Sequence, residues 1–134
     1  MFGSAPRLGK VQLRIMQVLW RSGKATARQI TDELAQQEPI AHSTVQTLLR
    51  KLETKGAITH DIEERTFVFR PIFDREEVSD SALHDVLTRV FHGSVYGLVS
   101  QLLACEKLPQ EELDRLRRLI DSAEKGEIDD AAME

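Results

Sequence analysis

The segment from Ile40 to Gly56 constrains the fold of this chain more than any other part of the sequence. Four apolar residues in it follow the i, i+3, i+4, i+7 spacing of a helix with one buried face: Val45, Leu48, Leu49 and Leu52. The opposite face is polar and cationic, and it carries Ser43, Thr47, Arg50 and Thr54, flanked by Gln46 and Lys51. A helix that enters the major groove of DNA needs such a face, because small side chains allow close approach and Gln, Thr and Arg contact base edges and phosphates. An ordinary solvated helix fits this segment equally well, so the neighbouring elements must distinguish the two.

The sequence around this helix predicts two more helices and a hairpin. The expected elements are helices over residues 10–21 and 26–34, extended runs at 57–60 and 66–70, and a loop at 61–65 between these runs. Gly23 suits a left-handed helix end, and Thr26 and Gln29 have the spacing of a capping box. Three helices followed by a hairpin predict a winged helix-turn-helix. In such a domain the second helix crosses the DNA backbone, the third enters the major groove and the hairpin is the wing.

Two parts of this arrangement, the start of the third helix and the wing, each have more than one interpretation. Ser43 and Gln46 also have capping-box spacing, so Ser43 is either the cap of the third helix or a DNA contact. In the hairpin, Arg65 near the tip and Arg70 at the base are candidate phosphate contacts. The two glutamates before Arg65 are unsuited to a surface that meets phosphate. The wing is therefore the weakest part of the DNA-binding hypothesis.

Charge divides the chain into a basic first half and an acidic second half. Residues 1–73 contain 11 Lys and Arg against 7 Asp and Glu, whereas residues 74–134 contain 7 against 15, within a net charge of −4. Only the first half is therefore expected to meet a polyanion. No stretch reaches the roughly 20 apolar residues of a membrane span, and the N-terminus has no signal-peptide pattern. A single cysteine, Cys105, excludes an internal disulfide, so we expect a cytoplasmic protein without membrane insertion.

The acidic half contains three further helical stretches with apolar stripes, separated by His92-Gly93-Ser94 and Lys107-Leu108-Pro109. Asp74 is placed to cap the first of them. Three short helices enclose a small core, so we expect the remaining apolar surface to pair with a second copy in a symmetric dimer. Packing against the first half of the same chain is the alternative. The expected organisation is mainly α with a small β-hairpin: a winged-helix domain over 1–73, a helical dimerisation domain over 74–124 and a disordered acidic tail over 125–134.

The residue types that carry catalytic or metal chemistry are scattered. The four histidines are His42, His60, His84 and His92, and none has metal-ligand spacing to another or to Cys105. The sequence has no glycine-rich phosphate loop, no nucleophile elbow and no carboxylate pair in a setting for acid–base work. We therefore expect neither an enzyme nor a bound metal or cofactor.

Taken together, these elements resemble the penicillinase-repressor family of BlaI and MecI type, which includes the copper-responsive CopY-type repressors. The matching residues of the first half are Leu19-Trp20, Ser43 to Leu49, Leu52, Lys55-Gly56 and Phe67 to Pro71. Those of the second half are Val90 to Ser94, Leu98-Val99, Glu106 to Leu108 and Glu112-Leu113 to Leu119-Ile120. Both blocks occur in the family's order.

The resemblance implies a cytoplasmic homodimer that represses transcription by binding an inverted repeat of TACA/TGTA type. It implies that Thr44, Gln46 and Thr47 read bases and that Arg50 and Lys51 contact the DNA backbone. With the residues found above, the candidate DNA contacts are Ser43, Thr44, Gln46, Thr47, Arg50, Lys51, Arg28 and Arg65. The candidate dimer interface consists of Val90, Phe91, Val95, Leu98, Val99, Leu102, Leu116 and Leu119.

The resemblance also implies mechanisms by which the protein would release DNA. The sequence of this chain matches the residues that these mechanisms use only in part. In relatives of the β-lactam branch, a membrane metalloprotease sensor causes cleavage in the helix that matches Val95 to Leu103. The matching bond here is Gln101-Leu102, where those relatives have Asn-Phe. The copper branch has a paired-cysteine tail, whereas this chain has only Cys105, which argues against copper sensing. The family often has Gly before the arginine that matches Arg65, and this chain has Glu64.

Two other classes of function compete with a repressor. A winged-helix module that binds a protein instead of DNA is favoured by the acidic net charge and by Glu63-Glu64. A metal or redox sensor rests on Cys105 and the scattered histidines. The polar face of the third helix, the basic first half and the family resemblance all favour DNA.

Overall fold

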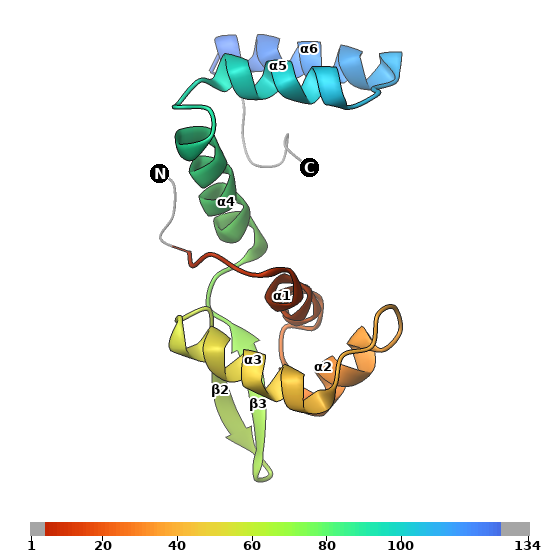
Figure 1. Cartoon of the computed structure of the whole chain (residues 1–134), viewed down its shortest axis with the longest axis vertical. Helices are drawn as coiled ribbons and strands as arrows, with labels where there is room; N and C mark the ends of the chain where they lie inside the picture. The colour runs from red at the N-terminus through yellow and green to blue at the C-terminus, as the bar shows by residue number, and fades with distance from the viewer. Residues whose placement is uncertain (1–4, 127–134) are drawn as a thin grey trace. The chain divides into compact units, whose positions relative to one another are not determined.

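The computed structural model describes residues 5–126 of the chain, which divides into two compact units, Met1–Val90 and Phe91–Glu134 (Figure 1). The sequence predicts a domain division between Phe73 and Asp74, whereas the compact units divide after Val90. The helix that follows Asp74 therefore belongs with the first unit. Most of the expected acidic tail, residues 127–134, lies outside the described residues.

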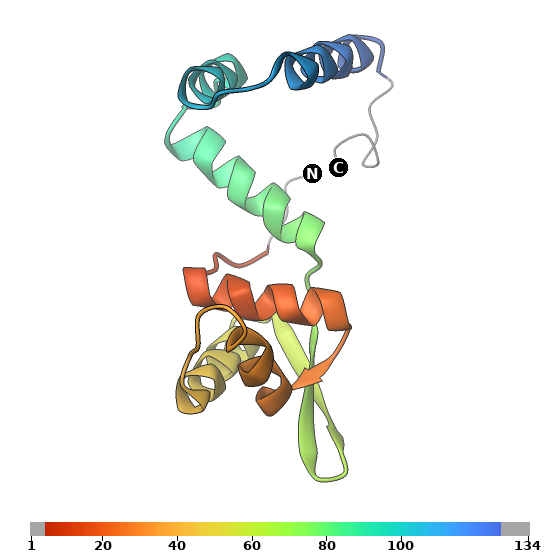
Figure 2. The ribbon, with the colours of Figure 1, turned by 90° about the vertical axis from the view of Figure 1, so that its right-hand side faces the viewer.

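The first unit is a winged helix-turn-helix, as predicted. The winged-helix elements are the helices α1 (Lys10–Ser22), α2 (Ala27–Leu34) and α3 (His42–Thr54) and a hairpin of β2 (Ile58–Glu63) and β3 (Thr66–Pro71). A two-residue strand that the sequence does not predict, β1 (Ala25–Thr26), pairs with β3 and completes an antiparallel sheet of order β1-β3-β2. The hairpin extends well beyond the three helices (Figures 1 and 2).

The core of this unit is formed by one apolar face from each of α1, α2 and α3 and by the inner ends of the strands. Its buried residues include Ile15, Met16, Leu19, Ile30, Leu34, Val45, Leu49, Leu52, Ile58 and Phe69. The predicted stripe of α3 is thus confirmed, with Leu48 packed half-buried against the cluster. Burial of this stripe leaves the polar face of α3 exposed to solvent.

Local sequence signals set the helix ends. The Thr26 hydroxyl accepts from the Gln29 backbone N–H at 3.1 Å, and the Thr26 N–H donates to Gln29 Oε1 at 2.8 Å, which confirms the predicted capping box. Gly23 has a positive φ of 80°, as its position after α1 predicted. The cap hypothesis for Ser43 is wrong, because the N-cap of α3 is Ala41 and no side chain caps this helix. Ser43 instead lies within the first turn.

The fourth helix, α4 (Arg75–Arg89), is tied to the rest of the first unit by polar contacts. Its cap is the predicted Asp74, whose carboxylate accepts from the Glu77 N–H at 2.8 Å. Ser81 Oγ donates to the Ala5 carbonyl at 3.0 Å, and Asp85 pairs with Arg7. These contacts hold the N-terminal segment beside α4.

The second unit contains α5 (Val95–Cys105) and α6 (Gln110–Glu124), joined by an extended connection (Figure 2). Ser94 caps α5, since its hydroxyl accepts from the Gly97 N–H at 2.9 Å. No residue between Phe91 and Gly126 is buried in the single chain. Within the described range, no helix has the length and apolar character that crossing a membrane would require.

Candidate nucleic-acid interface

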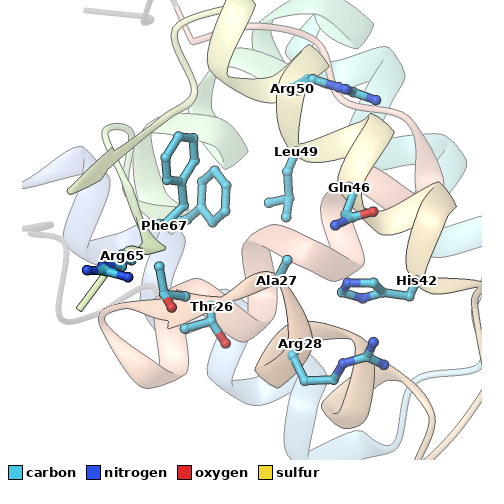
Figure 3. Close-up of a pocket in the computed structure, with 11 residues that line it drawn as sticks. Thr26, Ala27, Arg28, His42, Gln46, Leu49, Arg50, Arg65 and Phe67 are labelled. Carbon is cyan, nitrogen blue, oxygen red and sulfur yellow. The ribbon is translucent and has the colours of Figure 1, made fainter. Parts of the chain in front are cut away.

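A groove of about 520 Å³ separates the polar face of α3 from the start of α2 and from the wing (Figure 3). It is lined by Thr26, Ala27, Arg28, His42, Gln46, Leu49, Arg50, Arg65, Thr66, Phe67 and Phe69. Three residues of α3 face it at helical intervals of four, namely His42, Gln46 and Arg50. The capping box of α2 places Arg28 on the opposite side, and the wing turn supplies Arg65.

The groove has a strongly cationic lining. The residues that line it include Arg28, Arg50 and Arg65, and no Asp or Glu. None of these three arginines forms an ion pair with a carboxylate between residues 5 and 126. Three unneutralised cations from three separate elements leave the groove suited to an extended anion.

The exposed face of α3 is ordered by hydrogen bonds within the helix. Thr47 Oγ1 donates to the Ser43 carbonyl at 3.0 Å, and Arg50 Nη2 donates to Thr47 Oγ1 at 3.4 Å. Thr54 Oγ1 donates to the Arg50 carbonyl at 2.9 Å. These bonds hold the hydroxyl groups close to the helix and direct Arg50 along its surface.

The wing is built on an aromatic cluster on the face of the hairpin that lines the groove. The His60 ring stacks on Phe67 with centroids 3.9 Å apart and planes 11° apart, and Phe69 packs edge-on against Phe67 at 6.2 Å. Phe67 nevertheless remains 48% exposed beside the groove. This cluster stiffens the strands that hold Arg65.

The wing turn consists of two residues, where the sequence predicts a five-residue loop. Glu63 pairs with Thr66 across the strands, so Glu64 and Arg65 alone form the turn. Both have left-handed backbones, with φ of 51° and 67°, which side-chain-bearing residues adopt at a cost. Lys24 Nζ lies 3.1 Å from Glu63 Oε2 and neutralises one of the two unfavourable glutamates.

The groove gathers four of the eight predicted DNA contacts, namely Arg28, Gln46, Arg50 and Arg65. The other four, Ser43, Thr44, Thr47 and Lys51, are exposed on α3 outside the groove lining. Arg70 pairs with Asp61, with Nε 3.1 Å from Oδ2, so its charge is partly neutralised. His42 and Phe67 also line the groove, which the sequence did not predict. The four-residue spacing of His42 from Gln46 was the available signal for the first of them.

The predicted dimer contacts lie in both units and have mixed exposure in the single chain. Val90, Val95, Val99 and Leu102 are exposed by 63%, 60%, 41% and 52%. Phe91, Leu98, Leu116 and Leu119 are half-buried. Tyr96, which is not among the predicted contacts, is 86% exposed on α5.

Potential metal and redox residues do not converge in the described structure. Between residues 5 and 126, no group of three or more His, Cys, Asp or Glu side chains is placed to hold a metal ion. Cys105 is exposed at the end of α5.

Comparison with known proteins connects this geometry to a family. A sequence profile described as "Penicillinase repressor" matches residues 8–122, which extend through both compact units. The chain belongs to the penicillinase repressor family. Its relatives in this family include the penicillinase repressor of Bacillus licheniformis, 28% identical over 116 residues that cover 87% of this chain and 91% of the relative. The transcriptional regulator BlaI of Mycobacterium tuberculosis is 28% identical over 122 residues, which cover 90% of this chain and 87% of the relative.

A solved structure supports the assignment of the first unit within the penicillinase repressor family. The solution structure of the DNA binding domain of the repressor BlaI is 29% identical and has a TM-score of 0.50. The similarity covers 56% of this chain and 92% of that domain.

Proposed function

We propose that this member of the penicillinase repressor family is a DNA-binding transcriptional repressor without enzymatic activity. In this proposal it binds an inverted repeat of TACA/TGTA type as a homodimer. The observation that carries the proposal is the groove lined by Arg28, Arg50 and Arg65, none of which has a carboxylate partner among the described residues. Such groups neutralise phosphates, while the polar residues of α3 are available to base edges.

The fold supports this assignment of roles. Packing of Val45, Leu49 and Leu52 into the core leaves the polar face of α3 exposed, as a helix in the major groove requires. The hairpin extends beyond the helices, with Arg65 in its terminal turn, so it can reach the phosphates beside the groove. The relatives named as repressors favour the same conclusion.

The proposed homodimer rests on the second unit. Two helices without a buried residue cannot stabilise a fold by themselves, because the free energy of folding comes mainly from apolar burial. Their exposed apolar side chains include Val95, Tyr96, Val99, Leu102, Leu103 and Ile120. A second copy offers an identical surface, and two-fold pairing would match a two-fold symmetric operator.

We further propose that cleavage of Gln101-Leu102 by a membrane metalloprotease sensor would release the DNA. This bond lies inside α5, the helix that carries much of the exposed apolar surface. Cutting it would divide that surface and weaken pairing. Mass spectrometry of the chain from induced cells would detect a fragment that ends at Gln101, and an intact chain under derepressing conditions would exclude this step.

Fluorescence anisotropy would test DNA binding with two labelled duplexes, one with the TACA/TGTA inverted repeat and one with a scrambled sequence, over a salt series. We expect a preference of about a thousandfold for the repeat and an affinity that falls steeply as salt rises. Equally weak binding to both duplexes would contradict this operator. Selection from random duplexes would then separate a different operator from a protein-interaction module, which would enrich no sequence.

A further inference from the structure

His42 has an orientation that is determined by a buried partner on another helix. It is the first residue of α3, is half-buried and lines the groove. Its Nδ1 lies 2.8 Å from Oγ1 of Thr31, a residue of α2 with only 8% of its surface exposed. In the close-up, the ring lies at the groove between Gln46 and Arg28 (Figure 3).

The hydrogen-bond partners of Thr31 determine which nitrogen of the His42 ring carries the hydrogen. Thr31 Oγ1 donates to the Ala27 carbonyl at 2.9 Å, and a carbonyl oxygen can only accept. A hydroxyl has a single hydrogen, so the Thr31 oxygen acts as acceptor toward His42. Nδ1 must therefore carry the hydrogen, and Nε2 of the neutral ring keeps a lone pair.

Nε2 is the atom of His42 that remains available to a ligand. The two ring nitrogens lie on different edges of the imidazole, so the bond from Nδ1 to Thr31 directs Nε2 away from that contact. Nε2 has no hydrogen-bond partner in the part of the chain that is described. It adds an acceptor to a groove in which Arg28, Arg50 and Arg65 can only donate.

We propose that His42 is a specificity-determining residue, whose Nε2 accepts a hydrogen bond from a base amino group in the major groove. The inference rests on the proposed DNA-binding function and adds a base contact to it. The amino groups in the major groove are N4 of cytosine and N6 of adenine, whereas guanine and thymine present oxygens there. His42 therefore selects cytosine or adenine over guanine or thymine at one position of the contacted strand in each half-site. Thr31 is the positioning residue for this contact.

Selection from a library of random-sequence duplexes tests this role whichever operator the chain binds. The full chain is compared with His42→Ala and Thr31→Val, and Thr31→Ser serves as the matched control because it keeps the hydroxyl. We expect the wild-type chain to prefer amino bases at one symmetric position by roughly 2- to 13-fold, as a single hydrogen bond allows. His42→Ala and Thr31→Val lose this preference while the rest of the selected sequence is retained, and Thr31→Ser rescues it.

Nitrogen NMR of the free protein gives a second readout that does not depend on DNA. We expect the neutral His42 ring to carry its hydrogen on Nδ1 in the wild type and in Thr31→Ser, and to lose this bias in Thr31→Val. A hydrogen on Nε2 in the wild type would overturn the assignment of the acceptor. An unchanged base preference in His42→Ala would overturn the role in specificity, even if DNA binding itself is established. A wild-type chain that enriches no sequence would overturn the proposed function, and the DNA contact of His42 with it.

Discussion

His60 Nδ1 lies 2.6 Å from Glu53 Oε1, and this contact joins the wing to the last turns of α3. His60 belongs to β2 and also stacks on Phe67 of β3, so one ring connects both strands of the hairpin to the helix. The two side chains are partly covered, with 25% and 37% of their surfaces exposed. The wing is thereby held in a defined position relative to the polar face of α3.

Removal of this connection should weaken both stability and DNA binding. We expect His60→Ala to lower the free energy of unfolding by about 1–2 kcal/mol, since it loses a hydrogen bond and an aromatic stack. His60→Phe keeps the stack and loses the bond to Glu53, so its loss should be smaller. Denaturant unfolding measures these differences, and equal stability of His60→Ala and the wild type would contradict a role in fixing the wing.

The three unpaired arginines of the groove should each contribute to the salt dependence of DNA binding. We expect Arg28→Gln, Arg50→Gln and Arg65→Gln each to weaken binding across all sequences and to reduce the slope of log affinity against log salt by about 1. Arg70→Gln is the matched control, because Arg70 already pairs with Asp61. Anisotropy titrations at several salt concentrations measure the slopes. A slope change for Arg70→Gln as large as for Arg65→Gln would place the phosphate path elsewhere.

A charge in the exposed apolar surface of α5 should break the proposed dimer. Leu102 is 52% exposed in the single chain, so Leu102→Asp should place a carboxylate in the interface while the winged-helix elements, which have their own buried core, stay folded. Ser100→Asp adds the same charge at an exposed position of the same helix. Sedimentation velocity should show a monomer for Leu102→Asp and a dimer for Ser100→Asp. Operator affinity should fall with the dimer, because each half-site is then bound independently. A Leu102→Asp chain that remains dimeric would move the interface away from this residue.

The left-handed turn of the wing offers a way to stabilise the protein. Glu64 has a φ of 51°, a conformation that glycine adopts without a side-chain penalty. We expect Glu64→Gly to raise the free energy of unfolding by up to about 1 kcal/mol and, through removal of a negative charge, to strengthen DNA binding. Glu63→Gly is the control, because Glu63 lies in a strand where glycine should destabilise. Thermal unfolding and anisotropy measure the two effects, and a less stable Glu64→Gly chain would show that the turn is not strained.

Features that depend on nearby residues could be predicted from the sequence. The Thr26–Gln29 capping box and the buried stripe of α3 are specified within a few residues, and both are confirmed. The strand β1 could not be predicted in this way, because its two residues form a strand only through pairing with β3, which lies more than forty positions later. The predicted length of the wing turn was also wrong, since Glu64-Arg65 lacks the glycine or asparagine typical of two-residue turns.

In the candidate site, too, the features set by nearby residues could be predicted and those set by distant contacts could not. The polar face of α3 follows from helical periodicity, so Gln46 and Arg50 could be identified at once. The orientation of His42 depends on Thr31, which is eleven residues away on another helix. Such a contact has no local sequence signal. The absence of carboxylates from the groove lining likewise becomes visible only when α2, α3 and the wing are brought together.

The uncovered apolar surface of α5 also bears on how gene dosage would govern this protein. The concentration of a homodimer varies with the square of the chain concentration as long as most chains are monomeric. Halving the number of copies in a cell would then lower the number of pairs about fourfold. Occupancy of a target promoter would respond steeply to expression and degradation, so modest changes in the lifetime of the chain could switch a gene without any change in affinity for DNA.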